Sequence, residues 1–173
     1  MACLRDGIFA GALISAVVLL CKLLYYPIYA PENYVTDLTL LAATFFFAYH
    51  YRKTLPEGKV FFKELMLYGL GLGVVAAIVY GLFLLLYGGV IDKEFAARCL
   101  EHFIHGEQQG SGTDEEKAAT IAVMQTYKLH TWAFIGAFRT AVMSIMTAFV
   151  AALVLRTEKN VVRPKPETTT NKK

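Results

Sequence analysis

The longest uncharged stretch of the chain, residues 65–90, limits its possible folds more than any other feature. All 26 of its residues lack a charge. As an α-helix it would extend ~39 Å, which exceeds the ~30 Å hydrocarbon core of a bilayer. A soluble helix of this length needs a polar face, and a chain of 173 residues is too short to bury an apolar helix on every side. The stretch is therefore predicted to cross a membrane.

Three other apolar stretches predict an all-α integral membrane protein with a four-helix bundle. The predicted spans are residues 7–26, 35–51, 65–90 and 132–155. The second stretch is short for a membrane crossing, so a helix lying in the membrane interface is the alternative there. Arg5 precedes the first stretch, as a basic residue does in a signal peptide. The apolar stretch is too long for a signal peptide, however, and Pro31 would directly follow the cleavage site after Ala30. We therefore predict that the first span is retained as an anchor.

The distribution of basic residues predicts the orientation of the spans. The loop after the first span has no Lys or Arg, whereas residues 52–64 carry four and residues 156–173 carry six. Lys and Arg are enriched in short cytoplasmic loops, which places both termini in the cytoplasm. The single membrane domain is predicted over residues 1–156, and residues 157–173 are predicted to be a disordered, basic cytoplasmic tail.

Residues 92–131 form the only long polar region between spans and are predicted to be an external helical hairpin. Asp92 can cap its first helix, and Gly106 is expected to end that helix. Thr113 and Glu116 have the spacing of a capping box, which predicts that a second helix begins there. This second helix can run unbroken into the last span. The hairpin is the predicted contact surface for a protein partner.

Cys99, His102 and His105 are the residues in the hairpin that could bind a metal. Thiolate and imidazole are ligands that zinc prefers, but no second group of such residues follows. Cys99 also fits the apolar stripe of the first hairpin helix, so we predict an ordinary amphipathic helix without a metal or other cofactor. No motif for catalysis is present, and the protein is predicted not to be an enzyme. The basic residues flank spans, which does not favour nucleic-acid binding.

Arg139 is a charged residue well inside a predicted span, whereas Lys22 lies near the end of its own span. A charged side chain in hydrocarbon is costly and is a functional candidate by default. The region of Arg139, Tyr80 and Tyr87 is the candidate intramembrane polar site, with the two tyrosine hydroxyls or nearby backbone carbonyls as expected acceptors. The alternatives are that Arg139 anchors the helix by reaching the headgroups, as we expect for Lys22, or that it binds a ligand or ion. Asp37, at the start of the second predicted span, is assigned to the loop of residues 27–37, and no other acidic residue lies inside the four predicted spans.

Small residues at four-residue spacing predict close contacts between the spans. They fall on three of the spans: Gly7, Gly11 and Ser15 on the first; Gly69 and Gly73 on the third, with Gly71 between them; and on the fourth two sets, Ala137 with Ala141 and Ser144 with Ala148 and Ala152. Such faces allow two helix backbones to approach each other closely. The prediction is therefore a tightly packed bundle.

The order of these features resembles a bacterial family known as domain of unknown function 4199, whose members are small four-span membrane proteins. The resemblance extends over most of residues 5–156 and is carried by Phe62-Lys63-Glu64, the glycine-rich start of the third span, Tyr80 to Tyr87, and Ile91-Asp92-Lys93-Glu94-Phe95. It implies location in the bacterial inner membrane and implies no mechanism.

The expected role is structural or interactive, within the lipid bilayer, for a protein whose molecular activity is unknown. The alternative is a small transporter or channel subunit with an outward-facing polar pocket around Arg139. A polar cavity between the third and fourth spans would favour transport, and a tightly packed bundle would favour the interaction role. The sequence leaves the oligomeric state open.

Overall fold

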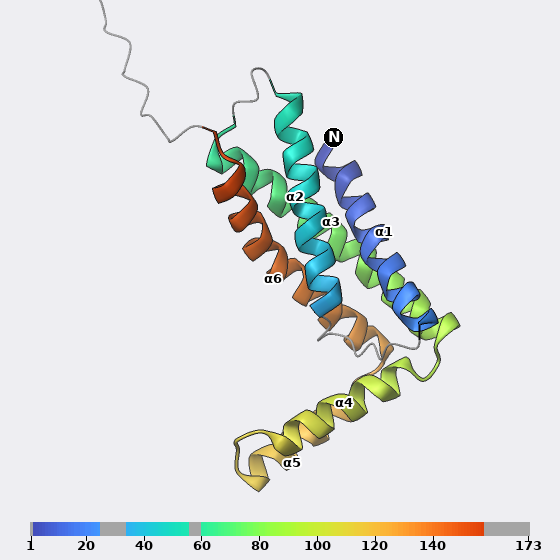
Figure 1. Cartoon of the computed structure of the whole chain (residues 1–173). Coiled ribbons are helices and arrows are strands. Elements are labelled where there is room, and N and C mark those ends of the chain that lie inside the picture. The colour runs from blue at the N-terminus through green and yellow to red at the C-terminus, as the bar shows by residue number, and fades with distance from the viewer. Residues whose placement is uncertain (1, 25–33, 56–59, 158–173) are drawn as a thin grey trace, which may run out of the picture.

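A computed structural model describes residues 2–24, 34–55 and 60–157, and within these ranges the regular structure is entirely helical (Figure 1). The elements in chain order are α1 (Ala2–Leu23), α2 (Tyr34–Thr54), α3 (Phe62–Leu86), the π-helical turn η2 (Tyr87–Ile91), α4 (Phe95–Gln109), α5 (Asp114–Met124) and α6 (Leu129–Leu155). The predicted all-α fold is confirmed. The predicted disordered tail lies outside the described residues except for Thr157. Ala30, after which a signal peptidase would cut, also lies outside them, so the prediction of a retained anchor stays a prediction.

Helix α3 lies at the centre of the molecule, with α1 against one side and α6 against another. Three described helices are long and apolar enough to cross a membrane: α1, α3 continued by η2, and α6. These correspond to three of the four predicted spans, and the large apolar side chains exposed on their outer faces suit a lipid environment.

The contact between α3 and α6 depends on small residues, as predicted. A Cβ atom added to Gly73 would lie 2.0 Å from the Cβ of Ser144, and one added to Gly69 would lie 2.7 Å from the Cβ of Ala148. A Cβ atom on Gly7 of α1 would come within 2.6 Å of the Cβ of Val75. Both interfaces therefore require glycine at the point of closest approach.

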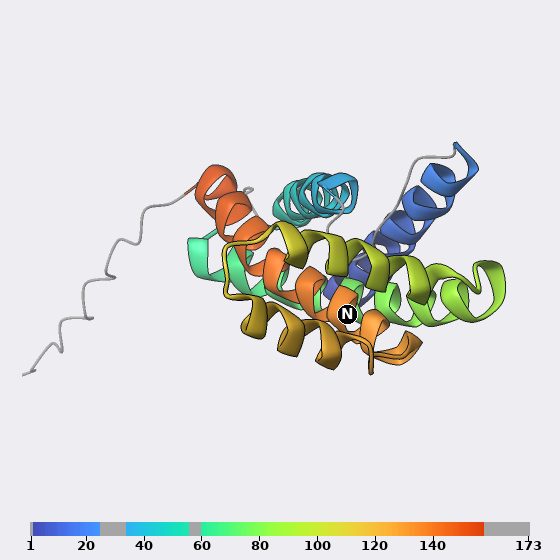
Figure 2. The ribbon, with the colours of Figure 1, turned by 90° about the horizontal axis from the view of Figure 1, so that it is seen from below.

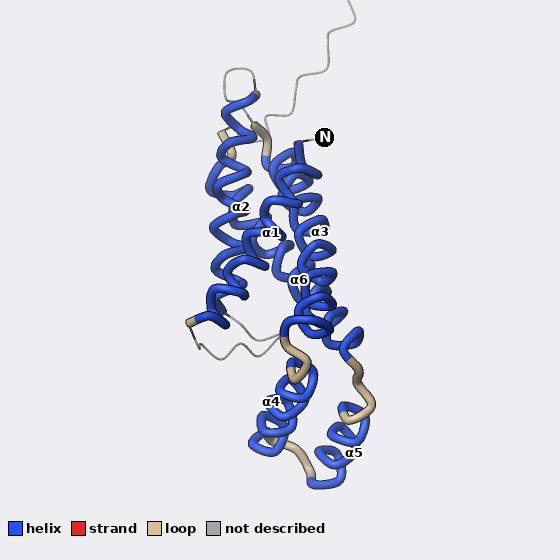
Figure 3. Tube along the Cα trace, turned by 90° about the vertical axis from the view of Figure 1, so that its right-hand side faces the viewer, coloured by secondary structure: helices blue, strands red, loops and turns tan. Residues whose placement is uncertain are grey.

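Helix α2 is longer than the apolar stretch that predicted it, because it begins at Tyr34 and ends at Thr54. It lies beside α1 and α6 (Figures 1 and 3). At its C-terminal end, the Arg52 guanidinium donates a hydrogen bond to the carbonyl oxygen of Leu155, 3.3 Å away, at the C-terminal end of α6. In its middle, the Thr44 and Thr147 hydroxyls lie 3.5 Å apart. Helix α2 therefore runs along much of the bundle.

Helices α4 and α5 form the predicted hairpin, which projects from the end of the bundle opposite the N-terminus (Figure 1). Seen along the bundle, the two helices lie across that end (Figure 2). Gly106 does not end α4, which continues to Gln109; nothing lies within 4 Å of a Cβ atom placed on Gly106, so no packing demand stops the helix there. Helix α5 also ends at Met124 and does not run unbroken into α6.

The predicted capping box at the start of α5 is confirmed. The Thr113 hydroxyl accepts from the Glu116 backbone N–H at 3.3 Å, and the Glu116 carboxylate accepts from the Thr113 backbone N–H at 3.0 Å. These two bonds satisfy N–H groups that a helix start leaves without intrahelical partners. They also hold the pKa of Glu116 below its usual value.

Candidate functional site

The base of the hairpin contains a buried carboxylate, Asp92, that connects three elements. Its residue surface is 5% exposed. The Lys22 ammonium in the last turn of α1 donates to Asp92 Oδ2 at 2.6 Å, and the Tyr87 hydroxyl in η2 donates to the same oxygen at 3.1 Å. The Arg98 guanidinium in α4 is the third donor to this atom. We name Asp92, Lys22, Tyr87 and Arg98 the Asp92 cluster.

The electrostatics of the Asp92 cluster favour an ionised carboxylate. Burial opposes ionisation, but the hydrogen bonds from Lys22, Arg98 and Tyr87 outweigh it and hold the pKa of Asp92 below its usual value. The same bond raises the pKa of Arg98. Glu94 lies 3.7 Å from Arg98, so two cations face two anions and their formal charges cancel. The prediction that Lys22 reaches the headgroups is therefore replaced by a specific ion pair.

The π-helical turn η2 places Tyr87 and Asp92 in this cluster. The Asp92 backbone N–H donates to the carbonyl oxygen of Tyr87 at 2.8 Å, which is the five-residue bond of a π-helix. A Cβ atom on Gly88 would lie 2.3 Å from a methyl carbon of Leu129, at the start of α6. Gly88 therefore allows α6 to begin directly against the turn that carries Asp92.

Aromatic side chains also pack α4 against the start of α6 at the base of the hairpin. Trp132 of α6 is 2% exposed, and its ring centroid lies 5.2 Å from that of Phe103 in α4. Tyr127, which precedes α6, lies 5.5 Å from the same indole. These contacts and the Asp92 cluster fix α4 to the bundle at two places.

Arg139 lies beside α2, and its ion-pair partner differs from the predicted acceptors. The guanidinium donates to Asp37 Oδ2 at 2.6 Å. Asp37 was assigned to the loop before the second span, but α2 begins at Tyr34 and brings Asp37 inside the bundle. The Tyr87 hydroxyl donates to Asp92. The prediction that Arg139 donates to Tyr80 or Tyr87 is therefore wrong.

Tyr80 packs in the core on the α3 side of α6. Its residue surface is 4% exposed, and its ring edge lies 3.8 Å from a Cβ atom placed on Gly136. The Leu84 side chain lies only 2.6 Å from that Cβ position, so Gly136 permits a close approach of α3 at this level. The three predicted site residues therefore belong to two environments. Arg139 lines a groove between α2 and α6, and Tyr80 and Tyr87 lie in the core.

A second buried carboxylate, Asp6, lies near the opposite end of the bundle. The Tyr68 hydroxyl of α3 donates to Asp6 Oδ2 at 2.6 Å, and the neighbouring Arg5 donates to Oδ1 at 3.1 Å. The Tyr68 ring stacks on Tyr51 of α2 with centroids 4.3 Å apart. Sequence reasoning missed this contact because Asp6 lies just before the first predicted span, where an acidic residue needs no partner.

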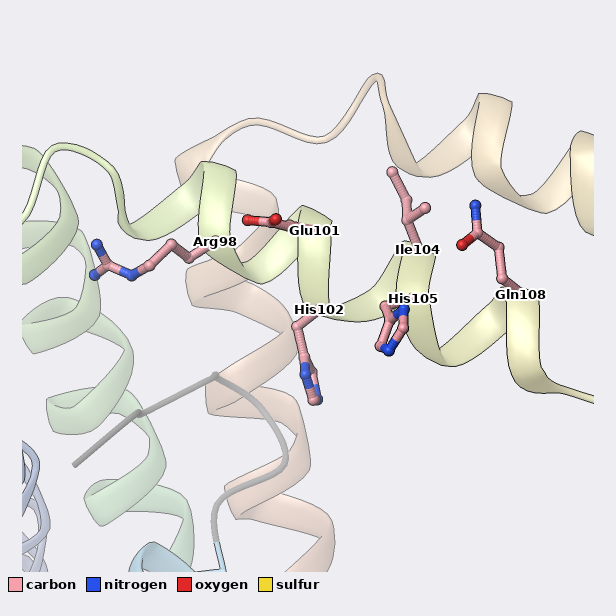
Figure 4. A pocket seen from close by; sticks show the side chains of 6 residues that line it. All are labelled: Arg98, Glu101, His102, Ile104, His105 and Gln108. Carbon is pink, nitrogen blue, oxygen red and sulfur yellow. The ribbon is translucent and has the colours of Figure 1, made fainter.

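The outer face of α4 lines an open pocket of about 540 Å³ (Figure 4). Its lining side chains are Arg98, Glu101, His102, Ile104, His105 and Gln108. Cys99, in contrast, is 1% exposed and packs in the core, so it is separated from the two histidines. Within residues 2–24, 34–55 and 60–157, no three Cys, His, Asp or Glu side chains gather as a metal ion would require.

The comparisons with known proteins identify a family without assigning an activity. Residues 5–157 match the family described as protein of unknown function (DUF4199), which agrees with the resemblance seen in the sequence. No curated protein and no solved structure matches the chain. The match extends from the start of α1 to the end of α6 and so includes both the bundle and the hairpin. The chain is therefore a membrane protein that belongs to the DUF4199 family, whose molecular function is unknown.

Proposed function

We propose that α2 is a fourth membrane span. It contains 21 residues, which as a helix extend ~31 Å and match the ~30 Å hydrocarbon core. Its C-terminal end meets the C-terminal end of α6 through Arg52, and Asp37 near its start meets Arg139 nearer the hairpin. Its apolar residues are therefore placed alongside those of α1 and α6.

The proposed location is the bacterial inner membrane, with both termini in the cytoplasm and the hairpin outside. The family resemblance supports the inner membrane. The concentration of Lys and Arg in residues 52–64 and 156–173 supports the orientation, because cytoplasmic loops carry this excess.

The proposed role is non-enzymatic: the bundle holds the α4–α5 hairpin outside the bilayer as a contact surface for another membrane or external protein. The observation that carries this proposal is the Asp92 cluster, because one buried carboxylate joins α1, η2 and α4 where the hairpin meets the bundle. Beyond this anchored base, α5 has no buried residue in this structure, so its surface is available for a partner.

The packing of α3 against α6 favours this role over transport. A cavity between these two helices would favour a transporter, but their backbones approach closely at Gly69, Gly73 and Gly81. The groove that Arg139 lines lies instead between α2 and α6, on the outside of the bundle. The proposed contact involves no nucleic acid.

Photo-crosslinking in intact cells tests the interaction role. A photoreactive residue at the exposed position 118 of α5 should yield a discrete crosslinked protein, whereas one at the exposed position 134 of α6, which faces lipid, should not. The Asp92→Asn variant should reduce the yield at position 118. Glu94→Gln is the matched control, because Glu94 is 85% exposed and contributes only a peripheral contact to Arg98. Equal crosslinking at positions 118 and 134, or none at 118, would contradict the proposal.

A further inference from the structure

The groove between α2 and α6 has an apolar floor that ends at an ion pair. Its volume is about 540 Å³. The apolar part is lined by Leu38 and Leu41 of α2 and by Met143, Met146 and Val150 of α6. At the end nearer the hairpin lie Asp37, Arg139 and Tyr34. The groove is therefore amphipathic along its length.

The charged end remains accessible from the groove. The side chain of Arg139 is 28% exposed and that of Asp37 is 19% exposed. A guanidinium has five N–H donors and a carboxylate has about four acceptor positions, so each group can make more bonds than the single one that joins them. At the boundary of the hydrocarbon core, such groups gain from further polar partners, because an unsatisfied charge is costly next to hydrocarbon.

The dimensions of the groove correspond to one leaflet. Arg139 and Val150 are 11 residues apart on α6, which amounts to ~16 Å along the helix. Half of a ~30 Å hydrocarbon core is ~15 Å. An acyl chain can therefore follow the apolar floor from Met143 to Val150 while its headgroup stays at the level of Arg139 and Asp37.

The two charges select the headgroup. A purely anionic headgroup that approached Arg139 would also meet the Asp37 carboxylate, 2.6 Å from the guanidinium. A headgroup that carries both a phosphate and a primary ammonium complements both residues. A quaternary ammonium has no N–H to donate to Asp37, so a choline headgroup matches this end less well.

We propose that the groove binds phosphatidylethanolamine from the bilayer, with its phosphate at Arg139, its ammonium at Asp37 and one acyl chain along Met143 and Met146. The lipid occupies a lateral site that is separate from the hairpin. The proposal therefore stands or falls independently of the hairpin as a contact surface.

Native mass spectrometry of the full chain tests this site. Delipidated protein in detergent is titrated separately with dioleoyl phosphatidylethanolamine, dioleoyl phosphatidylglycerol and dioleoyl phosphatidylcholine. The wild type should retain phosphatidylethanolamine about tenfold better than either other lipid, because charge-assisted hydrogen bonds form to both halves of the headgroup. Arg139→Gln and Asp37→Asn should each remove most of this preference. Lys128→Gln is the control for loss of a cation near the same end of α6, and it should retain the preference.

Filling the groove tests the acyl-chain site without changing the ion pair. Met146→Trp should abolish lipid retention, whereas Ile145→Trp, which adds the same ring at a neighbouring exposed position outside the groove lining, should leave it unchanged. Equal retention of the three lipids by the wild type would overturn the proposal. Retention of the lipid by Met146→Trp at the wild-type level would also overturn it. A dimer whose formation displaces the lipid would overturn it as well, because the occupant of the groove would then be a second copy of the chain.

Discussion

At the scale of single residues, three acidic side chains determine how the helices are joined. Asp92 pairs with Lys22 and Arg98, Asp37 pairs with Arg139, and Asp6 accepts from Tyr68 and Arg5. Each carboxylate bonds a residue from another helix. A buried ion pair contributes little net stability over an apolar pair, but removing one partner leaves a charge without compensation.

Asp92→Asn should therefore destabilise the base of the hairpin. Lys22 would lose its anionic partner and Arg98 would keep only its longer contact with Glu94. We expect a loss of about 1–3 kcal/mol, below the value for fully buried pairs because both cations are partly exposed. Trp132 is the only tryptophan of the chain and packs on Phe103 of α4, so its emission reports this region. Its emission should shift to longer wavelength at a lower temperature than in the wild type. Identical transitions in Asp92→Asn and in the wild type would contradict an anchoring role.

The pH dependence of the same emission follows from the lowered pKa of Asp92. Because the folded state binds this proton less readily than the unfolded state, Asp92 adds stability above its unfolded pKa of about 3.9, and this stability is lost as the pH falls through the lower folded pKa. The difference in the thermal unfolding midpoint between the wild type and Asp92→Asn should therefore become smaller below pH 4. A difference that stays constant or widens on acidification would show that ionisation of Asp92 is not the cause.

At the scale of elements, the helix contacts depend on glycine where two backbones meet. Gly73 of α3 faces Ser144 so closely that any side chain forces α6 to move, whereas a Cβ atom on Gly89 of η2 would lie 3.8 Å from its nearest neighbour. Gly73→Ala should lower the free energy of unfolding by about 1–3 kcal/mol through overpacking. Gly89→Ala is the control and should leave the thermal midpoint in detergent nearly unchanged. A Gly73→Ala protein as stable as the control would contradict the observed α3–α6 interface.

Helix α5 depends on its N-terminal cap rather than on packing. Thr113→Ala removes the hydroxyl that accepts from the Glu116 N–H, and loss of such a cap should speed hydrogen exchange in the first turns of α5 about fivefold. Exchange in α3 and α6 should not change, because neither helix contacts this cap. If α5 exchanged at the wild-type rate, its order would have to come from contacts other than the cap.

At the scale of the whole molecule, the sequence predicted the membrane helices and the hairpin because their signals are local. An uncharged run, a capping box and small residues at four-residue spacing each act within one helix. The ion pairs could not be predicted in the same way, because Arg139 and Asp37 are 102 positions apart and only the packing of α2 against α6 brings them together. The start of α2 at Tyr34 lies one residue before the predicted start at residue 35, and most of the additional length of α2 lies at its C-terminal end, up to Thr54.

The burial of Cys99 also changes how the topology can be measured. A thiol in an external hairpin would ordinarily report its side of the membrane by reacting with a membrane-impermeant reagent, but Cys99 is 1% exposed and packs in the core, so it is not accessible to such a reagent. Exposed positions at the ends of the helices are needed instead. Ala2, Thr54 and Ser111 are exposed and lie at the start of α1, the end of α2 and the tip of the hairpin.

Whether α2 crosses the membrane decides the proposed four-span arrangement, and labelling these three positions measures it directly. Ala2→Cys, Thr54→Cys and Ser111→Cys are introduced singly into a chain without its native cysteines, and intact cells with a permeable outer layer receive an impermeant maleimide. Four spans predict labelling of Ser111→Cys alone, with Ala2→Cys and Thr54→Cys labelled only after lysis. If Ala2→Cys and Thr54→Cys reacted from opposite sides, α2 would not cross the membrane and the arrangement would be wrong.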